Sequence, residues 1–360
     1  MRRRSTLLRL CFLGALLLVS SAILVAVSAC RKQGEQQTAG PGNLTVVSYG
    51  GGAWQDSHKK AFIEPFEKIN GADITSEAWN AEYAKLKTDV DNHAVKWDVV
   101  EVTAAQFVRG KRDGIFEPQS TGLMSDQFVR GAIDPQGVAN VYWSTVMAWS
   151  KDSFGGRAPA SWKDFWDVTR FPGARALYDD PRANLEIALL ADGVDARHLY
   201  PLDVERAFRS LDRIKPYVRI WWTDGSQPIQ LLTTQQVALS SAWNGRLFAA
   251  RSDAPGIRWS WAGAALDLDW WVIPKGAPHP QLAQRFIWFA SQACPMAEQA
   301  RLVGYGPANI AAVGLLPPEL QRLLPTHSDN LGQQFFVDSA WWADHESDLQ
   351  KRWSIWKASR

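Results

Sequence analysis

Tryptophan is the side chain whose abundance points to binding chemistry. The 360-residue chain contains 19 tryptophans, including adjacent pairs at 221–222, 270–271 and 341–342. Indole rings pack against alkyl chains, and their faces attract ammonium groups. In a strand, one member of each pair points inward and the other outward, so we expect Trp222 to face a binding cleft. The alternative is that these rings fill the core.

A glycine turn at residues 50–52 is the second candidate. It follows a short β-rich run at 44–49 and precedes a helical pattern. Glycines let a backbone approach a ligand closely, and neither GxGxxG nor GxxxxGK[ST] is present to suggest a phosphate loop. We therefore expect Gly51 and Gly52 to line a cleft, with Trp54 covering the ligand.

Catalytic and metal-binding motifs do not occur in the sequence. Its six histidines show no HExxH spacing, and it has no GxSxG segment. We predict no catalytic residue, no metal and no cofactor, although an exported hydrolase built from distant residues stays open as an alternative. The formal net charge of +2, with 21% charged residues, gives no basic stripe for nucleic acid.

The elements that would position these residues alternate between strand and helix. Strands at 44–49, 74–79 and 98–102 are separated by helical patterns, the first of which Pro65 should kink or restart. The same alternation returns between residues 175 and 243, with strands at 175–178 and 218–222 and a helical face at 204–214. The chain should cross into the second lobe near residues 149–159 and return near 270–274. This order predicts an α/β fold whose mostly parallel sheets are flanked by helices, and the length of the chain favours two lobes.

The N-terminus resembles a bacterial lipoprotein signal. Three arginines at 2–4 precede an apolar stretch at 10–29, which ends in Val27-Ser28-Ala29-Cys30. The resemblance implies removal of residues 1–29, a lipid on Cys30, and a location at the periplasmic or cell-surface face of the cytoplasmic membrane. Residues 30–42 read as a flexible tether. The alternative is a single membrane-spanning helix.

Six motifs in the remaining chain resemble the spermidine/putrescine-type solute-binding proteins of ABC importers. They occur in the family's order and cover nearly all of the mature chain. The motifs are Tyr49-Gly-Gly-Gly-Ala-Trp-Gln-Asp56, Leu177-Tyr-Asp-Asp-Pro-Arg182, Tyr200-Pro-Leu-Asp-Val-Glu-Arg-Ala-Phe208, Ala242-Trp-Asn-Gly-Arg246, Asp269-Trp-Trp-Val-Ile-Pro-Lys-Gly276 and Gly304-Tyr-Gly-Pro-Ala-Asn309.

The resemblance implies a two-lobed, hinged periplasmic-binding-protein fold of type II. Lobe one would comprise residues 43–148 and 271–310, and lobe two residues 149–270 and 311–360. A monomer would capture a small amine between the lobes and deliver it to a permease in the inner membrane with its ATPase. A receptor that presents its ligand to a signalling partner is an alternative.

The family's site also implies roles for particular residues. Trp243 would stack on the ligand, Asp269 would bind an amine, Tyr305 would be a cleft aromatic, and Asp180 would be the acid of the other lobe. The complete candidate set is Gly51, Gly52, Trp54, Thr103, Asp180, Trp222, Trp243, Asn244, Arg246, Asp269, Trp270 and Tyr305.

Two positions depart from the pattern of polyamine binders. A second acid of the family is replaced by Ala183, and a small residue is replaced by Arg246. A permanent guanidinium charge repels a diamine and binds a carboxylate. A polyamine is the first expectation from the family, and a zwitterionic ω-amino acid such as γ-aminobutyrate, held by Arg246 and Asp269, is the alternative. A structural ion pair of Arg246 with Asp269 or Asp224 would involve no ligand.

Overall fold

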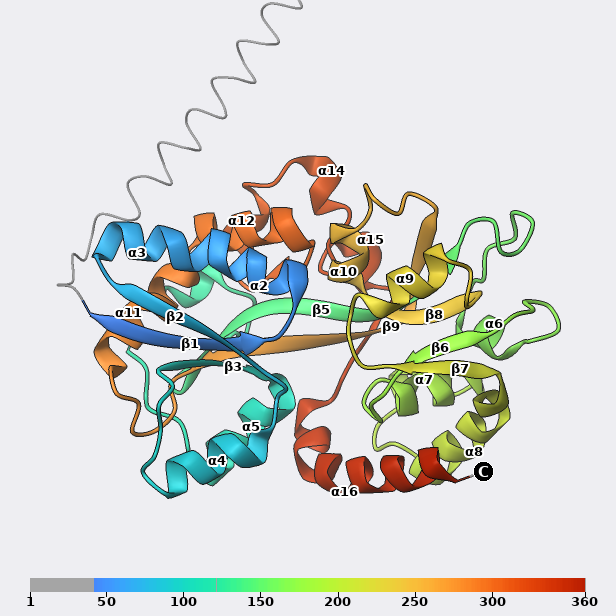
Figure 1. Ribbon diagram of the computed structural model, residues 1–360, viewed down its shortest axis with the longest axis horizontal. Helices are drawn as coiled ribbons and strands as arrows, with labels where there is room; N and C mark the ends of the chain where they lie inside the picture. The colour runs from blue at the N-terminus through green and yellow to red at the C-terminus, as the bar shows by residue number, and fades with distance from the viewer. Residues whose placement is uncertain (1–41, 121, 360) are drawn as a thin grey trace, which may run out of the picture.

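A computed structural model describes residues 42–120 and 122–359 of the chain (Figure 1). The predictions for the signal peptide, Cys30 and nearly all of the tether lie outside these residues. The first half contains β1 (Asn43–Tyr49), α2 (Gly52–His58), a π-helical turn (Lys59–Ile63), α3 (Glu64–Asn70), β2 (Asp73–Trp79), α4 (Tyr83–Asp91), β3 (Val99–Thr103), α5 (Ala104–Asp113), β4 (Ile133–Asp134), β5 (Gly137–Ser150), α6 (Trp162–Trp166), β6 (Arg175–Tyr178) and α7 (Asn184–Ala191).

The second half continues with the same alternation and ends in helices. It contains α8 (Val204–Ile214), β7 (Val218–Trp222), α9 (Gln227–Thr233), β8 (Leu239–Trp243), α10 (Asn244–Ala249), β9 (Ile257–Val272), α11 (Pro280–Ala290), α12 (Ala293–Val303), β10 (Gly306–Pro307), α13 (Ile310–Val313), α14 (Pro318–Gln321), α15 (Ser328–Leu331), β11 (Phe335–Phe336) and α16 (Ser339–Ala358). Short 3₁₀ turns lie at Ser125–Gln127, Ala196–His198 and Lys215–Tyr217.

The described residues form one sheet of 11 strands, in the main order β2-β1-β3-β9-β5-β8-β6-β7. Pairing is parallel at both ends, where β1 joins β2 and β3, and β6 joins β7 and β8. Pairing is antiparallel in the middle, where β9 joins β3 and β5, and β5 joins β8. The expected parallel arrangement therefore holds at each end of the sheet, and the long central strands make the sheet mixed.

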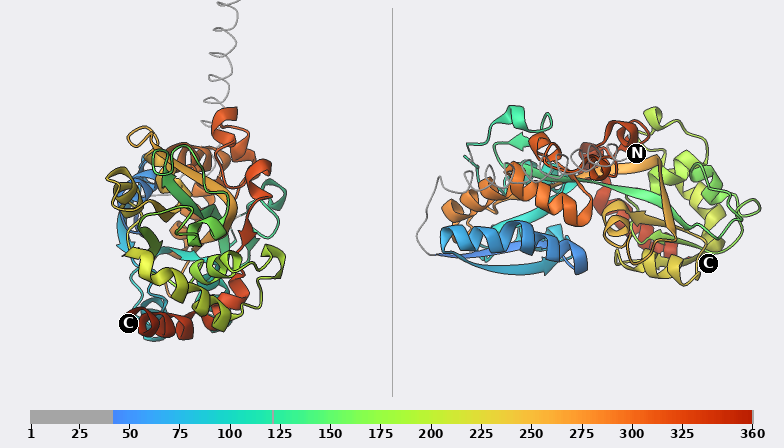
Figure 2. Two further views of the ribbon diagram at one scale, coloured as in Figure 1. Left: turned by 90° about the vertical axis from the view of Figure 1, so that its right-hand side faces the viewer. Right: turned by 90° about the horizontal axis from the view of Figure 1, so that it is seen from above.

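Two lobes lie side by side along the long axis, as Figures 1 and 2 show. Strands β5 and β9, of 14 and 16 residues, run from one lobe into the other. The sequence placed the crossings near residues 149–159 and 270–274 and did not predict the length of either strand. Because both strands pair with each other along most of their length, they form a continuous connection between the lobes.

Each lobe has its own hydrophobic core. The core of lobe one joins β1 and β3 to α3, α11 and α12, and it also contains Ala312, Leu316 and Leu324. The core of lobe two joins α6, α7 and α8 to Trp342 and Trp353 of α16. Residues 311–360, which were assigned together to lobe two, thus divide between the two cores.

Local sequence accounts for the elements that lead to the cleft. Pro65 lies in the first turn of α3, after the π-helical turn, so the helix restarts there as expected. Thr103 ends β3 and caps α5: its side chain accepts from the Gln106 backbone N–H, and the Gln106 side chain accepts from the Thr103 N–H. The chain therefore turns from strand to helix at a fixed residue.

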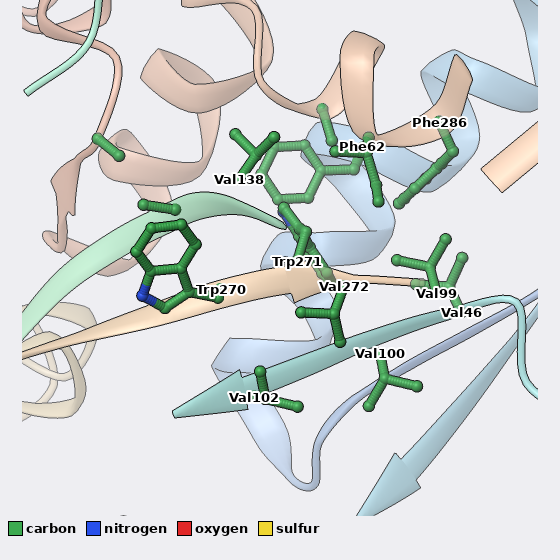
Figure 3. Packing of buried hydrophobic residues seen from close by; sticks show 14 of the residues in the cluster. Val46, Phe62, Val99, Val100, Val102, Val138, Trp270, Trp271, Val272 and Phe286 are labelled. Carbon is green, nitrogen blue, oxygen red and sulfur yellow. The ribbon is translucent and has the colours of Figure 1, made fainter. Parts of the chain in front are cut away.

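The alternation of side chains along β9 places neighbouring tryptophans in different surroundings. Trp271 packs beside Phe62, with ring centroids 6.3 Å apart (Figure 3). Trp270 stacks on Phe107 at 4.0 Å, so its indole belongs to the core of lobe one. Within the described ranges, no helix is both long and apolar enough to span a bilayer.

Candidate ligand-binding site

A cavity of about 510 Å³ lies between the two lobes. Its size is in the usual range for small-molecule sites, and its wall combines aromatic rings with a few charged groups. The lining residues are Tyr49, Gly50, Trp54, Trp79, Asn80, Ala81, Thr103, Trp143, Thr145, Tyr178, Arg182, Ala183, Thr223, Asp224, Gly225, Trp243, Arg246, Ala265, Asp267, Asp269, Tyr305 and Val337.

Strand ends and the central strands bring these residues together. Tyr49, Thr103 and Trp243 are the last residues of β1, β3 and β8, while Asp267 and Asp269 lie within β9. Thr103 is paired with Asp269 in the β3–β9 register. Ligands of α/β proteins bind beyond the carboxyl ends of strands, and this cavity has that position.

Three buried acids follow one face of the sheet. Glu101 pairs with Trp271, and Thr103 pairs with Asp269, so Glu101 and Asp269 are diagonal neighbours on the same face. Asp267 lies two residues before Asp269 and shares that face. These three residues, which we call the acid row, are each no more than 5% exposed.

Among the described residues, basic side chains contact the acid row only at its two ends. His58 Nε2 lies 3.6 Å from Glu101 Oε2, and Arg182 Nη1 lies 3.4 Å from Asp267 Oδ2. Asp269, in the middle, has no ion-pair partner within the described chain, and its Oδ1 accepts no hydrogen bond there. Burial, followed by repulsion from Glu101 and Asp267, raises the pKa of Asp269 well above its usual value.

Arg182 is a partly buried cation of the cavity wall. Its side chain is 15% exposed. Burial lowers its pKa, but the surrounding acids, chiefly Asp267 and then Glu346 and Asp180, outweigh that effect and raise it. Nη1, the atom nearest Asp267, donates no hydrogen bond to any described residue, and Arg182 lines the cavity. The guanidinium therefore stays charged and keeps a donor for a ligand.

Arg246 is the second cation and lies where the lobes meet. Its Nη1 donates to the Gly51 carbonyl oxygen at 3.0 Å, which joins lobe two to the glycine turn of lobe one. Its Nε is buried and finds no acceptor among residues that the structure describes. Asp224 is turned instead toward Ser226, whose backbone N–H donates to it at 2.8 Å. The structure therefore does not show the ion pair of Arg246 with Asp269 or Asp224 that the sequence had left open as an alternative.

Aromatic rings enclose the space between these charges. Trp243 packs edge-on against Tyr178 and Trp143, with centroids 5.2 and 6.1 Å apart. Trp54 packs edge-on against Tyr305 in the cavity wall, with ring centroids 5.1 Å apart. Indole and phenol faces of this kind suit an alkyl chain that ends in an ammonium group.

Six of the residues chosen from the sequence line the cavity, and six do not. Those that line it are Trp54, Thr103, Trp243, Arg246, Asp269 and Tyr305. Gly51 and Gly52 are exposed beside it, and Gly50 lines it in their place. The glycine turn therefore contributes to the rim, where the Gly51 carbonyl binds Arg246.

The other four residues do not line the cavity, and the side chain of each has a structural role. Asp180 accepts from Gln350 Nε2 at 2.6 Å and from the Arg182 backbone N–H at 2.8 Å. Trp222 is fully buried behind Trp243 and donates to Ser241. Asn244 accepts from the Ser144 N–H and donates to the Gly304 carbonyl, each within 2.9 Å. Trp270 belongs to the core of lobe one, stacked on a phenylalanine.

Sequence reasoning missed Arg182 and Asp267. Arg182 ends the Asp-Asp-Pro-Arg segment, from which only an acid was expected to reach the ligand. Asp267 stands two residues before Asp269, a spacing that places both carboxylates on one face of a strand. That spacing was the available signal. No group of three or more metal-ligating side chains occurs within residues 42–120 and 122–359.

Known proteins resemble this chain over most of its length. The γ-aminobutyric acid-binding protein of Pseudomonas aeruginosa is 40% identical over 323 residues, which cover 88% of this chain and 91% of the relative. The spermidine/putrescine-binding periplasmic protein of Escherichia coli is 25% identical, with 77% of this chain and 81% of the relative covered.

Solved structures agree with this relationship. The structure of the Atu4243 GABA receptor is 33% identical, with a TM-score of 0.82, and covers 88% of this chain and 98% of its own. The two-lobed α/β architecture is therefore that of periplasmic binding proteins. A family model described as bacterial extracellular solute-binding protein matches residues 61–323. This chain belongs to that family and is a solute-binding protein of an ABC importer.

Proposed function

We propose that the protein captures a short ω-amino acid, with γ-aminobutyrate as the first candidate. The observation that carries this proposal is the combination of unsatisfied polar groups in one cavity. Asp269 Oδ1 is a buried acceptor, and Arg182 Nη1 and Arg246 Nε are buried donors, all without hydrogen-bond partners in the described chain. A zwitterion supplies the ammonium for the first and the carboxylate for the others.

A polyamine fits these groups less well. Its ammonium groups are donors only, so Arg182 and Arg246 would keep unsatisfied N–H groups and would repel the ligand. Asp267 already has Arg182 as its partner, and Ala183 stands where polyamine binders have a second acid. Asp224, the third carboxylate of the wall, accepts from the Ser226 backbone N–H, so Asp269 is left to hold an amine. The site thus has one place for a cation and two donors for an anion.

The relatives support the same choice. The γ-aminobutyric acid-binding relative is 40% identical, whereas the spermidine/putrescine-binding relative is 25% identical. We also propose that a lipid on Cys30 anchors the protein at the membrane, that it acts as a monomer, and that a permease with its ATPase receives the ligand. The core packing supports a lobe one that includes residues 311–324, with the rest of the C-terminus in lobe two.

Calorimetric titration of the mature protein, freed of co-purified ligand, tests the proposal. The titrants are γ-aminobutyrate, putrescine and spermidine under identical conditions. We expect tight binding of γ-aminobutyrate and weak or undetectable binding of the polyamines. Tight polyamine binding without γ-aminobutyrate binding would reverse the assignment.

Variants then test which groups make the site. Asp269→Asn and Arg246→Gln should each weaken γ-aminobutyrate binding by about 2 kcal/mol or more, because each removes a charged partner of a hydrogen bond. Arg352→Gln is a matched control, because Arg352 pairs with Glu205 on the surface of lobe two. Unchanged affinity of Asp269→Asn would remove Asp269 from the site.

A further inference from the structure

The acid row has three carboxyl groups and basic neighbours only at its ends. Glu101, Asp269 and Asp267 share one sheet face, and the two basic side chains beside them, His58 and Arg182, lie at opposite ends of the row. The carboxylate in the middle is the one that lines the cavity without an ion-pair partner in the described chain. The ammonium group that Asp269 would receive is that of the proposed ligand, so an inference about this carboxylate rests on the proposed function.

Glu101 is held rigidly behind Asp269. Its Oε2 accepts from Trp54 Nε1 at 3.1 Å, and its Oε1 accepts from Asn140 Nδ2 at 2.8 Å. The side chain is completely buried, and these two hydrogen bonds hold it in place beside Asp269, whose pKa it raises by electrostatic repulsion.

The other groups that face Asp269 do not neutralise it in the empty cavity. Asp267, which pairs with Arg182, raises the pKa of Asp269 further, and the opposing effects of the Trp143 indole and of Arg182 on that pKa are smaller than those of burial, Glu101 and Asp267. Tyr49 and Tyr305 are neutral, and burial raises the pKa of each further above its usual value. Arg246 acts on Tyr305 from the rim, where its Nη1 is bound to Gly51.

We propose that Asp269 carries a proton in the ligand-free protein, and that the ammonium group of the ligand displaces this proton into solvent. The O–H bond of the carboxylic acid breaks, and its proton passes to water or buffer. The ligand keeps its three ammonium protons and donates them to the carboxylate that is formed. Binding of one amine ligand therefore releases one proton.

A proton released on binding makes affinity depend on pH. Below the pKa of Asp269 in the empty protein, and above its pKa in the complex, affinity falls tenfold for each unit by which pH is lowered. Glu101 is then a positioning residue: it fixes Trp54 and holds the proton on Asp269 without touching the ligand. Glu101→Gln removes this repulsion and should reduce the number of protons released.

Titration calorimetry counts the protons directly. γ-Aminobutyrate is titrated at pH 7 in phosphate and in Tris buffer, whose ionisation enthalpies differ widely. The wild-type protein should release about one proton, and Glu101→Gln and Asp269→Asn should release markedly fewer. Asp348→Asn, on an exposed side chain of α16, should match the wild type. Equal binding enthalpies in both buffers for the wild type would overturn the proposal.

Infrared spectroscopy of the ligand-free protein separates this proposal from the ligand assignment. At pH 7 the carbonyl absorption of protonated carboxylic acids should include a band that is lost in Asp269→Asn, whereas the contribution of Glu186, whose pKa burial raises to about 7, should remain. A spectrum unchanged by Asp269→Asn would refute the proton on Asp269, whatever ligand binds. If the band is lost in Asp269→Asn but γ-aminobutyrate does not bind, the ligand assignment fails and the protonated carboxyl stands.

Discussion

Breaking the buried ion pair of Arg182 and Asp267 should cost both stability and affinity. Arg182→Gln leaves Asp267, which is 5% exposed, without its cation 3.4 Å away. Removing one partner of a buried pair costs about 3 kcal/mol, because the remaining charge is neither paired nor hydrated. For a lobe that unfolds as a unit of roughly 150–250 residues, each kcal/mol lowers Tm by roughly 2–4 °C, so Tm should fall by about 6–12 °C.

A second substitution separates the ion pair from the ligand contact. Adding Asp267→Asn to Arg182→Gln removes the carboxylate that has lost its partner, so the double variant should recover most of the lost stability. It should not recover γ-aminobutyrate binding, because the Arg182 donor is still absent. Urea unfolding followed by circular dichroism gives the stability, and calorimetry gives the affinity.

An exposed pair serves as the control for the ion-pair argument. Arg352 and Glu205, with side chains 39% and 68% exposed, form a pair on lobe two. Arg352→Gln should cost less than about 1 kcal/mol, since surface pairs are screened by solvent. The reasoning is refuted if the double variant is less stable than Arg182→Gln, or if Arg182→Gln costs no more than Arg352→Gln.

The cavity wall and the core of lobe two support three further predictions. Trp243→Ala removes the central ring of the aromatic wall and should weaken γ-aminobutyrate binding about tenfold, as measured by calorimetry; an unchanged Kd would place the ligand elsewhere. Gly245→Ala would put a Cβ 2.2 Å from the Tyr305 ring and should lower both affinity and Tm, whereas Gly314→Ala, whose Cβ meets nothing closer than 3.5 Å, should change neither. Burial raises the pKa of Glu186 to about 7, so the fold prefers its protonated form, and stability should fall as pH rises from about 4.5 to 7. In Glu186→Gln, up to about 3 kcal/mol of this decrease in the free energy of unfolding should be absent, as measured by urea unfolding at pH 8. The same dependence of stability on pH in both proteins would show that Glu186 does not cause the decrease.

Much of the α/β pattern could be predicted because it depends on how apolar residues repeat over short stretches of the sequence. The strands at 175–178 and 218–222 and the helix at 204–214 have the predicted boundaries. Each is a short element in which apolar residues repeat at the spacing of a strand or helix and which a turn or cap ends. The helical restart at Pro65 is equally local, since a proline has no N–H to continue the preceding turn.

Only half of the candidate site could be predicted, because the direction of a side chain depends on packing between distant segments. Asp269 and Trp243 were found from motifs, but a motif does not reveal whether a polar side chain faces the cavity or a neighbouring helix. Asp180 turns toward Gln350 of α16, 170 residues away. Arg182, two positions later, turns toward Asp267 and the cavity instead.

The sequence by itself determined the alternation of strands and helices and the family. It also determined the chemical types in the site, which are aromatic rings, an acid and an arginine that polyamine binders do not have at that position. Only the tertiary structure decided which charges are paired and which are free. That outcome depends on the pairing of β3 with β9 and of β9 with β5, which brings Glu101, Asp267 and Asp269 onto one face from distant parts of the chain. Electrostatic energies depend on distances and burial in space, and the order of residues along the chain specifies neither.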